Sequence, residues 1–104
     1  MQEVIESDWK QFRNQLESWR EKYLFGVNKK LQKIMNDEKL TETVKFWKVK
    51  ETCDEKVKVL RLCFDDIRRS TMTIRLSAMF KYKIISNEDL QAFQDEHVKQ
   101  IMNW

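Results

Sequence analysis

The chain has 104 residues, enough for one small domain with a single hydrophobic core. Its 20 Lys and Arg against 17 Asp and Glu give a net charge of +3, which excludes a histone-like or RNA-coating composition. One glycine and no proline argue against folds built on many tight turns and exclude Gly-rich nucleotide-binding loops. We therefore expect one soluble domain over residues 1–104.

The first nine residues carry Glu3, Glu6 and Asp8 and no apolar run, which argues against a secretory leader. No segment approaches the roughly 18 apolar residues that a membrane span needs. Two cysteines, Cys53 and Cys63, are too few for a disulfide framework. The sequence predicts a cytoplasmic protein with reduced thiols and no membrane association.

Apolar residues near the start of the chain recur at alternating spacings of four and three, which is typical of one face of an α-helix. These residues are Ile5, Trp9, Phe12, Leu16, Trp19 and Tyr23. Gly26 interrupts the pattern, and a shifted apolar pattern continues to Met35. The pattern predicts a helix from about residue 3 that ends near residue 25 or continues past Gly26 to residue 35.

Two periodicities compete between residues 41 and 85. Alternating spacings of four and three from Cys53 to Ala78 favour helix, whereas strict alternation from Met72 to Ile84 favours a strand. We prefer helix, because a sheet would need two chain reversals between residues 50 and 72. Neither reversal contains residues that adopt a positive φ at low cost.

The last part of the chain begins with a helix-start pattern. Ser86 followed by Asp89 predicts a capping box before a final apolar periodicity. The predicted fold is all-α, a compact bundle of about four helices near residues 3–25 or 3–35, 41–69, 71–83 and 87–103. The alternative is an α+β fold with a three-stranded antiparallel sheet between the N- and C-terminal helices.

Little in the sequence points to catalysis. His97 is the only histidine, and no carboxylate stands at helical spacing to orient it. The two cysteines have neither the number nor the spacing of a zinc site, and they sit among apolar residues that raise a thiol pKa. We expect no enzyme activity, no cofactor and no metal site.

The aromatic and Met content suggests a binding surface, because it exceeds what a core of this size needs. Candidate clusters are Phe46 with Trp47, Tyr23 and Phe25 around Gly26, and Met102 with Trp104. We expect a protein-binding module of the adaptor, inhibitor, antitoxin or immunity type, or a homodimer. Its predicted partner-binding residues are Trp47, Phe46, Tyr23, Arg68 and Arg75.

A basic segment over residues 45–75 supports an alternative function, nucleic-acid binding. The candidate phosphate-binding residues are Lys45, Lys48, Arg61, Arg68, Arg69 and Arg75. The acidic balance of the last helix weakens this alternative, because phosphate would repel that helix.

Overall fold

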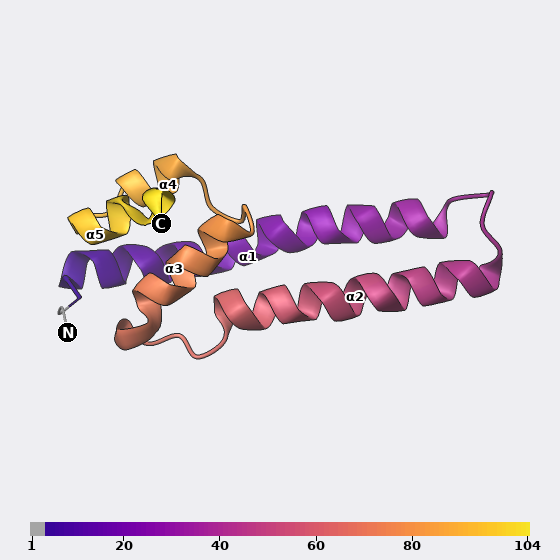
Figure 1. Cartoon of the computed structure of the whole chain (residues 1–104), viewed down its shortest axis with the longest axis horizontal. Coiled ribbons are helices and arrows are strands. Elements are labelled where there is room, and N and C mark those ends of the chain that lie inside the picture. The colour runs from indigo at the N-terminus through magenta and orange to yellow at the C-terminus, as the bar shows by residue number, and fades with distance from the viewer. Residues whose placement is uncertain (1–3) are drawn as a thin grey trace.

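A computed structural model describes residues 4–104 of the chain, and the all-α prediction is confirmed there. No strand occurs within these residues, so the α+β alternative is not supported. The two long helices, α1 (Glu6–Met35) and α2 (Glu42–Phe64), form an antiparallel hairpin (Figure 1). The expected helix start at residue 3 lies outside the described residues.

Three shorter helices, α3 (Met72–Lys81), α4 (Asn87–Gln91) and α5 (Glu96–Lys99), pack near one end of the hairpin, together with 3-10 turns at Arg69–Thr71 and Ile101–Asn103 (Figure 1). The other end of the hairpin extends beyond them. The molecule measures 53 × 24 × 23 Å, so it is elongated and differs from the compact bundle that we expected. We call residues 24–58 the arm and the rest of residues 4–104 the head.

Helix α1 continues without interruption through Gly26, which settles the choice between an end at residue 25 and an end at residue 35. Its apolar pattern faces the head, where Phe12 and Trp19 are buried and Trp9, Leu16 and Tyr23 pack around them. Ile5, the first residue of the pattern, is exposed and lies just before the helix.

Helix α2 ends at Phe64, five residues before the predicted end, because Asp65 adopts an extended backbone and Asp66 after it a left-handed conformation with φ of 51°. Arg68 fixes this turn by donating from Nε and Nη2 to the Asp66 carboxylate at 2.6 and 2.8 Å. The guanidinium of Arg68 holds the pKa of Asp66 below its usual range. Arg75 on α3 donates from Nη1 to the carbonyl oxygen of Leu62 at 2.9 Å, which satisfies an orphan acceptor at the end of α2.

Helix α3 ends in a left-handed turn at Lys83, whose φ is 61°. The Ile84 amide donates to the Met79 carbonyl oxygen at 2.8 Å, the hydrogen bond of a Schellman cap. The sequence argument that only glycine-like residues make such turns was therefore too strict, because Asp66 and Lys83 both adopt positive φ.

The predicted helix over residues 87–103 is divided into α4, α5 and the 3-10 turn Ile101–Asn103. The capping box is confirmed: Ser86 Oγ accepts from the Asp89 amide at 3.2 Å, and Asp89 accepts from the Ser86 amide at 2.8 Å. A second cap divides the segment, because the Asp95 carboxylate accepts from the His97 amide at 2.9 Å and starts α5. The apolar spacing of Leu90, Phe93 and Ile101 predicts a place for His97 on the buried face of a single helix, but His97 is exposed.

The hydrophobic core lies almost entirely in the head. Its fully buried members include Phe12, Leu76, Leu90, Phe93 and Val98, which come from α1, α3, α4, α5 and the connection between α4 and α5. In the arm, Val27 is the one buried hydrophobic residue. The arm is therefore held mainly by contacts between two helices, while the head has a core of its own.

Asp8 connects the two ends of the chain inside the head. Its carboxylate is 1% exposed and accepts from the amides of Gln94 at 2.7 Å and Asp95 at 3.0 Å. Both amides precede α5, where no intrahelical acceptor exists for them. One carboxylate in the first turn of α1 thus fixes the position of the last fifth of the chain.

Replacing Asp8 by alanine should destabilise the protein by about 2–4 kcal/mol, because two amides lose a charged acceptor in a buried setting. Urea unfolding followed by far-UV circular dichroism measures this change, with Ser7→Ala, at an exposed position of the same turn, as the control. A loss below about 1 kcal/mol would contradict a central role for this carboxylate.

Replacing Gly26 by alanine should stabilise the protein by about 0.5–1 kcal/mol, because alanine has the higher helix propensity. A Cβ atom built at Gly26 would meet no atom within 4 Å, so no clash opposes the gain. Thermal unfolding of the two proteins tests the prediction, and a lower melting temperature for Gly26→Ala would contradict it.

Candidate protein-binding groove

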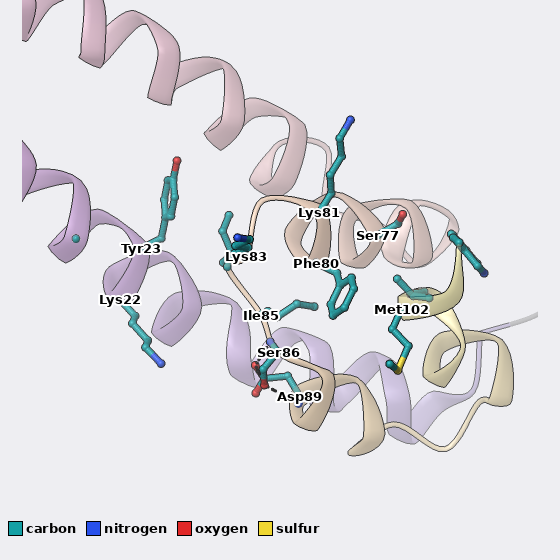
Figure 2. Close-up of a pocket in the computed structure, with 14 residues that line it drawn as sticks. Lys22, Tyr23, Ser77, Phe80, Lys81, Lys83, Ile85, Ser86, Asp89 and Met102 are labelled. Atoms are coloured by element: carbon teal, nitrogen blue, oxygen red, sulfur yellow. Dashed lines mark hydrogen bonds between the residues drawn. The ribbon is translucent and has the colours of Figure 1, made fainter.

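An open groove of about 1090 Å³ lies where the head meets the arm. Its walls come from the middle of α1, the end of α3, the connection to α4, the start of α4 and the last residues of the chain (Figure 2). The apolar and aromatic lining residues are Tyr23, Phe80, Ile84, Ile85, Ile101, Met102 and Trp104. The groove is therefore mainly apolar, as binding sites are.

The turn at Lys83 shapes one wall of the groove. After α3 ends, the left-handed residue reverses the chain so that Ile84 and Ile85 follow Phe80 into the same wall. Both isoleucines are also buried members of the core, so this wall is anchored to the head. The groove is consequently a preformed part of the fold.

Tyr23 on α1 also lines the groove, and its side chain extends from α1 toward α2 (Figure 2). Burial raises the pKa of its hydroxyl, with smaller contributions from Cys63, Glu55 and Tyr82. A tyrosine hydroxyl is protonated at neutral pH with or without this shift, and it can donate a hydrogen bond.

The rim of the groove is positively charged. Lys22, Lys81 and Lys83 line it, and none of them forms an ion pair with another residue of the described chain. Lys22 and Lys81 extend outward at opposite sides of the groove (Figure 2). Asp89, the carboxylate in the lining, accepts from the amide and hydroxyl of Ser86. The groove thus combines apolar walls with unpaired ammonium groups.

Gly26 lies in the α1 wall next to Tyr23. A glycine inside a helix costs about 1 kcal/mol relative to alanine, and the surrounding packing does not require one here. Its missing side chain leaves space in the groove, so an occupant can approach the α1 backbone closely.

The structure separates the predicted partner-binding residues. Tyr23 lies in the groove, whereas Phe46 and Trp47 are 62% and 58% exposed at the start of α2, on the arm. Their rings meet edge to face with centroids 5.2 Å apart. Arg68 and Arg75 lie elsewhere: Arg68, in the turn between α2 and α3, binds Asp66, and Arg75, on α3, binds the end of α2.

Several basic residues of the segment over residues 45–75 are paired with carboxylates within the chain. Arg69 pairs with Glu6 and also lies over the Trp9 ring, and Lys45 pairs with Glu42. Arg68 and Arg75 are engaged as described above. Among the six candidates for phosphate binding, only Lys48 and Arg61 form no ion pair within residues 4–104.

Two of the apolar clusters noted in the sequence meet in the groove, because it contains Tyr23 and Gly26 as well as Met102 and Trp104. Phe25 is not among its lining residues. Sequence reasoning missed the α3 side of the groove, namely Phe80, Lys81 and Lys83 to Ile85. The alternation of apolar residues in this segment can be seen in the sequence. It is the turn at Lys83, however, that brings Phe80, Ile84 and Ile85 into one wall of the groove.

Neither cysteine has the setting of a reactive nucleophile. Cys63 is fully buried, and burial raises its pKa to about 11, although the nearby Arg75 partly opposes the shift. Cys53 on α2 is half-buried and distant from the groove lining. Among residues 4–104, no group of three or more His, Cys, Asp or Glu side chains is placed to hold a metal ion.

No known protein family, curated protein or solved structure matches this chain. Within residues 4–104, no helix is long and apolar enough to cross a membrane.

Cys63 should resist alkylation in the folded protein, while Cys53 should react. At pH 8 a thiol with a pKa of about 11 is almost entirely protonated, and it is also shielded from reagent. Mass spectrometry after iodoacetamide treatment should find one modified cysteine in native protein and two in urea. Equal reaction of both thiols in native protein would contradict the prediction.

Proposed function

We propose that this chain is a small non-enzymatic protein-binding module and that the groove is its contact surface. The observation that carries the proposal is the meeting of Tyr23, Gly26, Met102 and Trp104 in one preformed concave surface. Aromatic residues and methionine are enriched in protein interfaces, where a few such anchors provide most of the binding energy.

The dimensions of the groove support a protein partner over a small molecule. Its volume of about 1090 Å³ is at the upper limit of small-molecule pockets, and it is open along one side. One wall is formed by a helix, α1, which contributes Lys22, Tyr23 and Gly26, and a partner helix can lie along such a wall. A partner segment could insert one or two large apolar side chains between α1 and α3.

The side chains of the groove support binding rather than catalysis. The lining contains neither His nor Cys, and its one carboxylate is already hydrogen-bonded to Ser86. The lysines have no general base beside them. A role in recognition accounts for the same residues without requiring further groups.

Nucleic-acid binding through residues 45–75 is the weaker candidate. Four of its six basic residues, Lys45, Arg68, Arg69 and Arg75, are paired with carboxylates of the same chain. Breaking these pairs would offset part of the gain from new phosphate contacts.

A peptide library displayed on phage tests the proposal. Selection on the native protein should enrich peptides with large apolar residues spaced three and four apart, as a helix requires. Filling the groove by Gly26→Trp should weaken their binding at least about tenfold, a loss typical of truncating or blocking one interface anchor.

Gly26→Ala is the matched control, because it adds a methyl group while leaving most of the groove open. Its binding should stay within about twofold of the native protein, and both variants should retain a cooperative thermal transition. Absence of enriched peptides, or equal binding to native protein and Gly26→Trp, would refute the groove as the contact surface.

A further inference from the structure

The second half of α1 carries a one-sided basic surface that starts in the groove. Between residues 22 and 36, α1 and its C-cap contain no Asp or Glu. Four lysines in this stretch share the side of the helix that Gly26 occupies, because they follow one another at helical spacings. We call them the lysine face: Lys22, Lys29, Lys30 and Lys33.

All four lysines are exposed, and none forms an ion pair within residues 4–104. Lys29 Nζ lies 4.6 Å from the centre of the Phe25 ring, so an exposed aromatic group accompanies the charges. Lys22 belongs both to this face and to the rim of the groove, where Lys81 and Lys83 stand opposite. The groove rim and α1 thus form one continuous positive surface.

This arrangement differs from the charges elsewhere on the hairpin. Helix α2 carries four acidic residues among its six basic ones, and Lys45 pairs there with Glu42 and Lys50 with Asp54, so part of its positive charge is balanced by counter-charges within the helix. The lysine face has none, and like charges at positions 29 and 33 repel each other weakly across one helical turn. A partner with carboxylates would remove that repulsion and supply the missing charge.

We infer that the partner segment is an acidic amphipathic helix, whose apolar side chains enter the groove and whose carboxylates lie along the lysine face of α1. This inference rests on the proposed function. Lys22 and Lys33 are 11 residues apart, about 16 Å along the helix axis, so about three turns of the partner would lie against α1. Helix-on-helix packing at about 8–10 Å brings long side chains of both helices together.

The apolar groove favours an acidic peptide over a nucleic acid. A phosphate backbone could contact the lysines, but the aliphatic wall of Ile84, Ile85 and Ile101 offers nothing to a phosphate or sugar. An amphipathic helix satisfies both parts of the surface at once. Single-stranded DNA is therefore the alternative that the experiment must distinguish.

Three labelled peptides of about 18 residues test the inference by fluorescence anisotropy at 50 and 200 mM salt. They share one helical apolar face of Leu and Trp and carry Glu, Gln or Lys on the flanking positions. The Glu peptide should bind at least about tenfold more tightly than the Gln peptide at 50 mM salt, and the difference should shrink at 200 mM. The Lys peptide should bind most weakly.

Charge reversal locates the contact. Lys29→Glu with Lys33→Glu should weaken binding of the Glu peptide about tenfold at 50 mM salt and leave the Gln peptide unchanged. The matched control is Lys10→Glu with Lys58→Glu, which changes the net charge equally at exposed sites outside the lysine face and should change binding less than about threefold.

The outcomes separate this inference from the proposed function. Equal binding of the Glu and Gln peptides, both blocked by Gly26→Trp, would overturn the acidic partner but support the groove. Failure of all three peptides to bind at 100 µM protein would overturn both. Tighter binding of a thymine 20-mer than of the Glu peptide, lost in Lys29→Glu with Lys33→Glu, would overturn the acidic helix in favour of single-stranded nucleic acid.

Discussion

The buried carboxylate of Asp8 is the contact on which the head depends. The helices α4 and α5 have five and four residues, far below the length at which a helix is stable alone. Their positions are fixed by burial of Leu90, Phe93 and Val98 and by the hydrogen bonds that two backbone amides donate to the Asp8 carboxylate. Because Asp8 belongs to α1, the longest helix helps to hold the two short helices α4 and α5 in place.

Because the short helices are held against the start of α1, they cover one end of the hairpin and leave the other end bare (Figure 1). The first half of α1 is covered by the head, whereas the part of α1 in the arm lies beside α2 and is mostly exposed (Figure 1). Apolar burial per residue is therefore low in the arm, and local opening should begin there. The groove lies at the boundary, where one wall belongs to the well-packed head and the other to α1.

The fold class and the first helix could be predicted from the sequence, because apolar residues such as Phe12 and Trp19 recur at spacings of three and four that fit the face of a helix and not a strand. The ends of α2 and α3 could not. They depend on the extended backbone of Asp65 and on positive φ at Asp66 and Lys83, of which the last is unusual for a lysine. The division of the last helix likewise follows from Asp8, which lies 86 residues before Gln94 in the chain. Tyr23 was predicted from the sequence as a binding residue, but the residues that line the groove with it, such as Phe80 and Ile85, are brought there by the tertiary structure.

The lysine face affects the stability of the part of α1 that lines the groove. The four lysines stand on α1 without acidic residues of the same helix at helical spacing to balance them. A cation interacts favourably with the helix dipole only in the last turn of the helix. Lys33 occupies the last turn and benefits from this effect, whereas Lys22 lies mid-helix and does not. Lys22 also stands beside Gly26, the weakest helix former of the segment. Gly26 therefore weakens the part of α1 that lines the groove, and a bound acidic helix would add packing and counter-charge at that place.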